Sequence, residues 1–538
     1  MELSRANLED KEFWTSKGYE LPSFDVKKVR DNTLKNPMWL HFGAGNIFRA
    51  YIAVLQQKLL NEGLSDRGII ACEFFDEEII DKAYKPFDNL SIAVTLKSDG
   101  NIDKKIVASV VDSIVAKKDL NKLFDIVNST SLEIISFTIT EKGYSLTNSQ
   151  GKYFKEVLED LEVLPKEPKS IMGLIALLCF KRYRKNKTPL TLLSLDNCFH
   201  NGLTLFNSVK TFADTWVTKG YVEKEFINYL SNNKYISFPW SMIDKITPRP
   251  SESVKKILQD DGINGVEIIE TSKHTYISSF VNAEEVGYLI IEDSFPNGRP
   301  PLEKAGVIFT DRETVDKAER MKVCTCLNPL HSILAIFGCL LGYNSVAKIM
   351  EDKTLRTLLE KAGYDELLPV VVDPKVINPH DFMREVLEKR FPNPYVPDTP
   401  QRIACDTSQI IPIRFGETLK SYLKRNKDTV KKLTFIPLFF AGWLRYLMAI
   451  DDEGKPFDLS PDPLNEELTN YMKKIKLGDK GPFTEILRPI LSNKNIFAVD
   501  LYECVLAEKV EQMFSELVGG KGMVKKTLDS YVNDKSKR

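Results

Sequence analysis

The stretch Met38-Trp39-Leu40-His41-Phe42-Gly43-Ala44-Gly45 decides the fold of the first half of the chain. Its first five residues form a short apolar run typical of a buried strand, and Gly43 and Gly45 then form a tight turn. Helical spacing follows over residues 47–60 and stops near Gly63. A strand, a glycine turn and a helix in this order bring backbone N–H groups and a helix N-terminus close to a ligand, which favours a negatively charged group.

Later segments extend this pattern into a sheet. Residues 68–72, 132–137 and 190–195 are expected to be buried strands, and helical stretches separate them, as in a parallel sheet with right-handed crossovers. After the turn-rich stretch 295–301, helical periodicity dominates. We therefore expect an α/β protein, with an N-terminal Rossmann-like parallel-sheet domain over residues 1–296 and a mostly α-helical C-terminal domain over residues 297–538.

Composition excludes several classes of protein. The 74 basic side chains balance 75 acidic ones, so nucleic acid is not an expected partner. The N-terminus lacks the pattern of a signal peptide, no run of uncharged residues is expected to cross a membrane, and the apolar stretch 436–450 is predicted to be a buried helix. Eight scattered cysteines and five histidines have no metal-ligand spacing, so we expect a cytoplasmic protein without a metal. The lysine-rich end 535–538 is expected to be frayed.

The glycine turn lacks one part of the usual dinucleotide-binding motif. Phe48 occupies the position of the third glycine, so the motif is weak by itself. Arg49 follows and has two interpretations, a phosphate ligand or a solvated helix residue. A carboxylate at the end of the second strand would bind the ribose hydroxyls and repel a 2′-phosphate, which predicts NAD rather than NADP. Glu73 is nearer to the strand end, while Asp76 also fits a helix N-cap.

The densest group of chemically useful side chains lies at the start of an apolar helix. It comprises Lys322, Asn328 and His331, the last two being three residues apart on one helical face. A lysine partly buried beside an apolar segment can have its pKa lowered towards neutrality, so it can exchange a proton with an alcohol or a ketone. An exposed helix entrance is the alternative interpretation of the same residues.

Six motifs, in order along nearly the whole chain, resemble the polyol-specific long-chain dehydrogenases, the family of mannitol dehydrogenase, fructuronate reductase and tagaturonate reductase. They are Gly43-Ala-Gly45-Asn-Ile-Phe48-Arg49, Thr138-Ile-Thr140-Glu-Lys142-Gly143-Tyr144, Ser194-Leu-Asp196-Asn197, Ser241-Met-Ile-Asp244-Lys-Ile-Thr-Pro248, Phe295-Pro-Asn-Gly-Arg299-Pro300, and the segment from Lys322 to His331.

The resemblance implies a role for each motif. Lys322 is expected to be the general acid/base, with Asn197 and Asn328 donating hydrogen bonds to the substrate oxygen and His331 and Asp244 near the substrate. Two amide donors and an ammonium group stabilise the negative charge that develops on a ketone oxygen as hydride arrives, without a metal. The cofactor-binding residues implied are Gly43, Gly45, Phe48, Arg49, Glu73, Thr140 and Lys142. For Asp196, which belongs to the third motif, a structural role is the alternative, in which its side chain caps or orients a loop.

One spacing departs from the family. The family usually has four residues between the lysine and the asparagine, whereas five separate Lys322 from Asn328. On a regular helix one extra residue rotates the lysine by about 100°. Either the backbone bulges before Asn328, or Lys322 lies just outside the helix, and we favour the second expectation because the neighbouring motifs still align.

Arginines bear on the choice of substrate, because a planar guanidinium matches the two oxygens of a carboxylate. Arg414 matches the Pro-x-Arg element of the uronate reductases, and Ile410 replaces their lysine. Arg402, Arg249 or Lys273 can compensate for that lysine if they line the cleft. The resemblance therefore implies NAD-dependent, reversible reduction of D-fructuronate to D-mannonate. Tagaturonate reductase and mannitol 2-dehydrogenase are the alternatives within this chemistry, and a non-catalytic nucleotide-binding protein is the alternative from another class.

Overall fold

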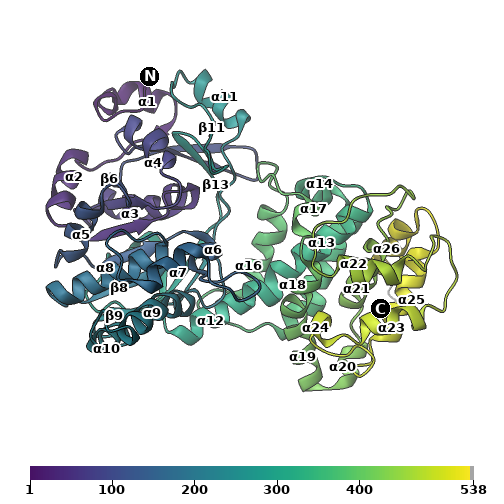
Figure 1. Cartoon of the computed structure of the whole chain (residues 1–538). Coiled ribbons are helices and arrows are strands. Elements are labelled where there is room, and N and C mark those ends of the chain that lie inside the picture. Colours follow the sequence, from purple (N-terminus) through teal and green to yellow (C-terminus); the bar gives the residue numbers. More distant parts are fainter. Residues whose placement is uncertain (534–538) are drawn as a thin grey trace. The chain divides into compact units, whose positions relative to one another are not determined.

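The computed structural model describes residues 1–533 and forms two compact units, Met1–Asp316 and Lys317–Arg538 (Figure 1). The lysine-rich end 535–538 lies outside the described residues. The division falls after Asp316, later than the boundary expected after residue 296. It does so because strand β15 (Ile308–Thr310) pairs in parallel with β14 (Tyr288–Glu292) and so belongs to the first unit.

A six-stranded sheet forms the centre of the first unit. Its strands, in spatial order, are β6 (Val110–Val115), β3 (Ile69–Glu73), β2 (Trp39–Phe42), β7 (Ile134–Phe137), β8 (Leu190–Ser194) and β9 (Ile236–Ser237). Every pairing in it is parallel. Numbered along the chain, this order is third, second, first, fourth, fifth and sixth, which is the strand order of a Rossmann fold. The predicted fold class is therefore confirmed.

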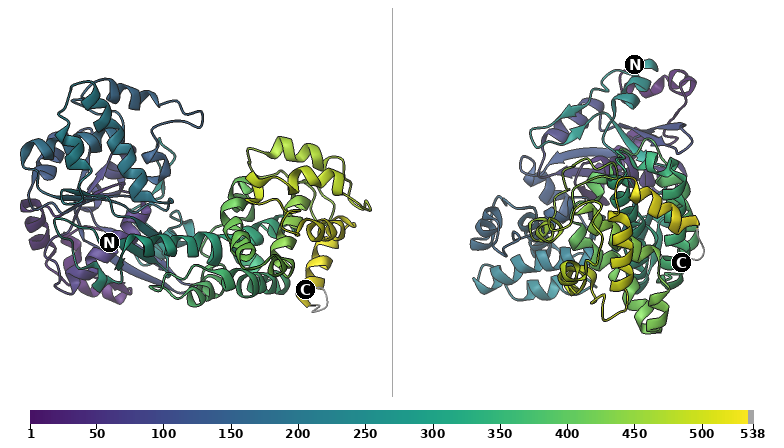
Figure 2. Two further views of the ribbon diagram at one scale, coloured as in Figure 1. Left: turned by 90° about the horizontal axis from the view of Figure 1, so that it is seen from below. Right: turned by 90° about the vertical axis from the view of Figure 1, so that its right-hand side faces the viewer.

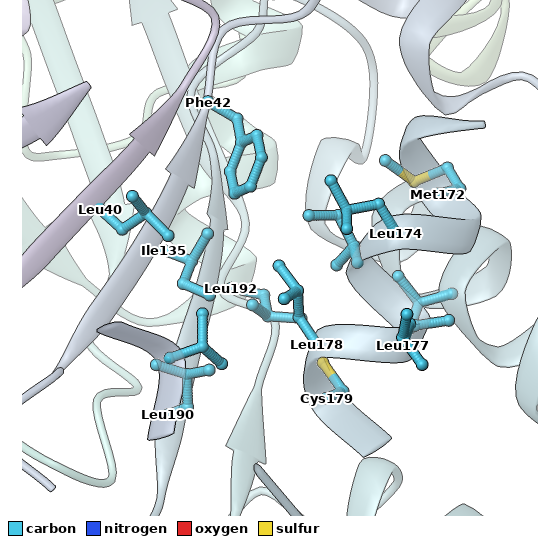
Figure 3. Packing of buried hydrophobic residues seen from close by; sticks show 14 of the residues in the cluster. Leu40, Phe42, Ile135, Met172, Leu174, Leu177, Leu178, Cys179, Leu190 and Leu192 are labelled. Carbon is cyan, nitrogen blue, oxygen red and sulfur yellow. The ribbon is translucent and has the colours of Figure 1, made fainter. Parts of the chain in front are cut away.

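Alternating side chains of the strands give the sheet two apolar faces. Leu40, Phe42, Ile135, Leu190 and Leu192 face helix α8 (Ile171–Lys185), where they meet Met172, Leu174, Leu177, Leu178 and Cys179 (Figure 3). The helices of this face also include α2 (Val26–Lys35), α5 (Leu120–Asn128), α7 (Lys155–Glu162), α9 (Asn201–Thr218) and α10 (Glu225–Leu230). Trp39 and Ile134 point to the other face, which is covered by the π-helix η2 (Phe48–Ile52), α3 (Ala53–Asn61) and α4 (Glu78–Ala83). This double cover explains the continuous apolar runs in the strand sequences.

Smaller sheets, which the sequence did not predict, are inserted in the first unit. They are a four-stranded sheet of β1 (Tyr19–Glu20), β5 (Ile102–Val107), β4 (Ser91–Leu96) and β13 (Phe280–Glu284), a three-stranded sheet of β10 (Ser241–Asp244), β14 and β15, and a hairpin of β11 (Ile269–Glu270) and β12 (Tyr276–Ile277). Helices α1 (Lys11–Ser16), α6 (Thr140–Tyr144) and α11 (Glu252–Asp260) complete the unit.

The second unit consists of helices, as Figure 2 shows from two sides. The long helix that leads into it runs from α12 (Arg312–Met321), whose first five residues belong to the first unit, through the π-helix η5 (Lys322–Cys326) into α13 (Asn328–Leu340). The other α-helices are α14 (Val346–Glu351), α15 (Lys353–Lys361), α16 (Pro379–Glu385), α17 (Pro400–Ile403), α18 (Thr407–Arg414), α19 (Gly416–Arg425), α20 (Lys427–Lys431), α21 (Phe435–Tyr446), α22 (Asn465–Met472), α23 (Thr484–Leu491), α24 (Lys494–Phe497), α25 (Ala507–Val518) and α26 (Met523–Asn533).

Two apolar helices bear on the question of a membrane. Helix α21, in the apolar stretch 436–450, has all of its residues buried, so the prediction of a buried helix there is confirmed. The helix Arg312–Leu340 is long and apolar enough to span a membrane by length and composition, which the sequence analysis did not expect. In the structure 78% of its most apolar window is buried, and a core helix of a soluble protein passes the same test.

The two glycines of the first turn have different structural demands. Gly43 has φ +97°, and a Cβ on it would lie 2.1 Å from the Thr138 carbonyl oxygen, whereas a Cβ on Gly45 would meet no atom within 4 Å. We therefore predict that Gly43→Ala lowers the free energy of unfolding of the first unit by more than about 2 kcal/mol, while Gly45→Ala changes it by less than about 1 kcal/mol. Urea unfolding followed by circular dichroism measures both. Equal changes in the free energy of unfolding for the two variants would contradict the close approach of Gly43 to the Thr138 carbonyl.

Candidate active site

A cleft of about 540 Å³ opens in the first unit where β2 and β7 end. The order of the sheet reverses between these two neighbours, and this is the place where doubly wound sheets bind ligands. Five of the predicted cofactor residues line the cleft, namely Gly43, Gly45, Glu73, Thr140 and Lys142. The first unit thus brings these five together, while their contacts with a cofactor stay predictions.

Glu73 holds the glycine turn against the second strand. One of its carboxylate oxygens accepts the backbone N–H of Ala44 at 2.9 Å, and the other accepts the N–H groups of Phe74 at 3.0 Å, Phe75 at 2.9 Å and Asp76 at 3.3 Å. Burial raises the pKa of this carboxyl, and the backbone N–H groups oppose that rise. The Glu73 carboxylate therefore uses most of its hydrogen-bonding capacity inside the protein, and its proposed contact with a ribose stays a prediction.

Asp76 has a different environment at the rim of the same cleft. Its Oδ2 accepts a hydrogen bond from Thr271 Oγ1 at 2.6 Å, whereas its buried Oδ1 has no partner among residues 1–533. The interpretation of Asp76 as a helix N-cap is wrong, since helix α4 starts after Glu77 and has no side-chain cap. A buried carboxylate oxygen without a partner is costly, so a hydroxyl donor entering the cleft would stabilise it.

Phe48 and Arg49 do not line this cleft. Phe48 is fully buried and stacks on the ring of His41. Arg49 is 1% exposed, donates from Nη1 to the Ser278 carbonyl at 2.8 Å and lies over the ring of Tyr84, whose hydroxyl donates to the Ala44 carbonyl at 2.8 Å. The interpretation of Arg49 as a solvated helix residue is therefore wrong, because the side chain is buried, whereas its contact with a phosphate stays a prediction.

The two predicted substrate residues of the first unit lie at the ends of strands. Asn197 is exposed and lies after the end of β8, and Asp244 is the buried last residue of β10. Their roles at a substrate stay predictions. The carboxylate of Asp196, next to Asn197, accepts the N–H groups of Ile139 and Thr140, both at 2.9 Å, so the interpretation that it orients a loop is confirmed.

Lys322, the predicted acid/base, is the first residue of the π-helix η5 and is 2% exposed. The N–H of Leu327 donates to the Lys322 carbonyl at 3.1 Å, five residues back, which is the hydrogen bond of a π-helix. Our expectation that Lys322 lies outside the helix is therefore wrong, as is the alternative of an exposed helix entrance. The other alternative, a backbone bulge before Asn328, accommodates the extra residue within the helix.

His331 lies one turn after Asn328, the first residue of α13. Its ring stacks on Phe391, and its Nε2 is 3.5 Å from Asp398 Oδ2. Burial lowers the pKa of His331 to about 4; Asp398 raises it, and three nearby arginines lower it further. His331 is therefore neutral around pH 7 and can exchange hydrogen bonds without carrying a charge.

The two predicted substrate arginines differ in how their charges are compensated. Arg402 binds both oxygens of Asp398, with Nε to Oδ1 at 2.7 Å and Nη2 to Oδ2 at 2.6 Å. Arg414 donates from Nη1 to Ser332 Oγ at 2.7 Å and to the Asn328 carbonyl at 3.3 Å, and no carboxylate among residues 1–533 forms an ion pair with it. Burial lowers the pKa of Arg414 to about 10. A guanidinium without a carboxylate partner among the described residues therefore lies beside Asn328.

Two site residues were missed by the sequence analysis. Asp398 lies four residues before Arg402 and just ahead of helix α17, and opposite charges at this short spacing could have suggested the ion pair. The bond between Thr271 and Asp76 has no such signal, since 195 residues separate the two. In the described residues no group of three or more histidine, cysteine or acidic side chains is arranged to hold a metal ion.

Comparison with known proteins places the chain in a family. Residues 37–304 match the mannitol dehydrogenase Rossmann domain, and residues 314–518 match the mannitol dehydrogenase C-terminal domain. The chain is 52% identical over 537 residues to a D-mannonate oxidoreductase of Thermotoga maritima, covering 99% of each chain. It is 28% identical over 505 residues to a mannitol 2-dehydrogenase of Neosartorya fischeri, covering 92% of this chain and 93% of that one.

Solved structures agree with this placement. The mannitol 2-dehydrogenase of Pseudomonas fluorescens, in a ternary complex with NAD and D-mannitol, superposes with a TM-score of 0.70 at 25% identity, over 99% of this chain and 100% of that one. A substrate-free D-sorbitol dehydrogenase shares the fold, with a TM-score of 0.77 at 24% identity over 94% of this chain and 97% of that one. The chain therefore belongs to the mannitol dehydrogenase family.

Proposed function

We propose that this protein is an NAD-dependent oxidoreductase that reversibly reduces the ketone of D-fructuronate to give D-mannonate. The full-length similarity to a D-mannonate oxidoreductase supports the reaction, and the similarity to a mannitol 2-dehydrogenase solved with NAD supports the cofactor. The observation that carries the choice of a sugar acid is Arg414, because a partly buried guanidinium that has no carboxylate partner within residues 1–533 favours binding of an anion. An uncharged polyol would not compensate this charge.

The cleft of the first unit fits a dinucleotide. Gly43 and Gly45 leave the backbone of the turn open to a pyrophosphate, and Asp76 Oδ1, which has no partner in the described residues, is an acceptor suited to a ribose hydroxyl. Thr140 and Lys142 lie at the same cleft and are proposed as further cofactor contacts. When bound, NADH supplies the hydride that adds to the carbonyl carbon.

Residues of the chain supply the rest of the proposed reaction. As negative charge develops on the carbonyl oxygen, the side-chain amide of Asn328 donates a hydrogen bond to it and the Lys322 ammonium donates the proton that completes the alcohol. The low exposure of Lys322 strengthens its electrostatic effect on that oxygen. Asn197 is proposed as a second donor, and Asp244, His331 and Arg402 as contacts of the sugar hydroxyls. In the oxidation direction Lys322 accepts the proton.

A cytoplasmic location is part of the same proposal. No disulfide joins the eight cysteines, all of which lie in the described residues, and this suits a reducing compartment.

The substrate is tested with a panel of D-fructuronate, D-tagaturonate and D-fructose, each with NADH and with NADPH. We predict the highest kcat/KM for fructuronate with NADH, because Arg414 binds a carboxylate that fructose lacks. Turnover is followed by the loss of NADH absorbance. Equal or better turnover of fructose would contradict the choice of a sugar acid, and no oxidation of NADH with any ketose would favour a non-catalytic nucleotide-binding protein.

Lys322→Ala tests the acid/base. We predict a fall in kcat of about 100-fold to 10,000-fold with an unchanged NADH dissociation constant, since Lys322 is proposed to exchange a proton with the substrate oxygen and not to bind the cofactor. The exposed lysine of α19 provides the control, and Lys420→Ala should leave both quantities unchanged. Wild-type kcat in Lys322→Ala would reject the assignment.

Asp76 and Glu73 can be separated as determinants of cofactor choice. We predict that Asp76→Asn lowers the preference for NADH over NADPH by about tenfold, since it removes the charge that repels a 2′-phosphate. Glu73→Gln should mainly lower the melting temperature, because its carboxylate binds four backbone N–H groups. Fluorescence titration with both cofactors measures the preference. A larger change in preference for Glu73→Gln than for Asp76→Asn would reverse the assignment.

A further inference from the structure

The turn that follows strand β7 has an unfavourable backbone conformation. Thr140, the first residue of α6, has φ +63°, in the left-handed region that favours glycine. A β-branched residue there persists only where its surroundings enforce the conformation, and such residues concentrate at functional sites. Thr138, Ile139, Thr140 and Lys142 all line the cofactor cleft, so the shape of the cleft depends on this turn.

The carboxylate of Asp196 is the group that holds the turn. Its Oδ1 accepts the N–H of Thr140 at 2.9 Å, and its Oδ2 accepts the N–H of Ile139 at 2.9 Å and the hydroxyl of Tyr144 at 2.6 Å. Two successive backbone donors thus converge on one acceptor group, which fixes the backbone that leads into the strained residue. Hydrogen bonds to an ionised carboxylate are stronger than those between neutral groups.

The backbone of Asp196 is held in turn by a second set of contacts. Its carbonyl accepts a hydrogen bond from Asn201 Nδ2 at 3.0 Å, and the same nitrogen lies 2.9 Å from Ser241 Oγ. The N–H of Ser241, the first residue of β10, donates to Asn201 Oδ1 at 3.0 Å. Asp196 therefore ties the turn after β7 to β8 and β10, immediately before Asn197.

We propose that Asp196 is a positioning residue of the enzyme, which keeps Thr140 in its left-handed conformation and thereby shapes the cofactor cleft. This inference rests on the proposed function, in that the cleft is taken to bind NADH. It adds a requirement that neither the family match nor the glycine turn states, namely that a carboxylate outside the cleft lining sets the affinity for the cofactor.

A double-mutant cycle of Asp196→Asn and Thr140→Gly tests the mechanism. Glycine adopts a positive φ without strain, so the conformation of the turn should depend less on the Asp196 carboxylate when glycine replaces Thr140. We expect Asp196→Asn to weaken NADH binding by about tenfold in the wild-type background, and by about threefold or less in the Thr140→Gly background. Fluorescence titration measures each dissociation constant, and the melting temperature is recorded in parallel. Equal losses in both backgrounds would overturn the proposal.

Hydrogen exchange on the cofactor-free protein separates this inference from the proposed function. Asp196→Asn should speed exchange at residues 139–144, and unchanged exchange there would overturn the proposal even if activity fell. Faster exchange in a protein that binds no NADH would contradict the proposed function, but it would still support the role of Asp196 in holding the turn after β7. Asp112→Asn is the matched control, since Asp112 lies in β6 of the same sheet and pairs with Lys122 at 2.6 Å; it should leave exchange and NADH binding unchanged.

A third variant covers the case in which Asp196→Asn does not fold. Tyr144→Phe removes one of the hydrogen bonds to Asp196 Oδ2 and keeps the ring. It then replaces Asp196→Asn in the cycle, and its effect on NADH binding must be larger in the wild-type background than in the Thr140→Gly background. A loss that is the same in both would count against the proposal.

Discussion

Two backbones approach each other closely at the centre of the parallel sheet, and the first unit is arranged around this contact. A side chain at position 43 would collide with the Thr138 carbonyl. The turn after β2 and the turn after β7 can therefore lie side by side only if residue 43 is glycine. Glu73 closes the first turn onto β3, and Asp196 closes the second turn onto β8. The cleft between these turns is therefore bounded by backbone held in place by two carboxylates.

The second unit meets a different constraint, the burial of charge. Lys322 is buried at the start of a π-helix and Arg402 is neutralised by Asp398, whereas Arg414 has no ion pair in the part of the chain that the structure describes. Placing cations in a weakly solvated region is costly, and an anionic substrate would offset that cost. The arrangement of charge thus supports a sugar acid as the substrate, whereas the similarity of this chain to the polyol dehydrogenases establishes only the family.

The sequence predicted the parts of this architecture that depend on local pattern. Strands β2, β3, β7 and β8 lie within two residues of their expected positions, because fully buried parallel strands leave continuous apolar runs. The strands of the inserted sheets were missed. Arg49 was misplaced because nothing in its neighbours along the chain shows that Ser278 and Tyr84 surround it. The extra residue before Asn328 was noticed, but its accommodation in a π-helix depends on hydrogen bonds that spacing alone does not reveal.

The most direct test of a sugar-acid substrate compares Arg414→Gln with the wild-type enzyme on D-fructuronate and on D-fructose. If Arg414 binds the carboxylate, kcat/KM for fructuronate should fall by about a hundredfold while that for fructose changes by no more than about threefold. Equal losses on the two substrates would contradict the account, since they would show that Arg414 supports the site without recognising an acid.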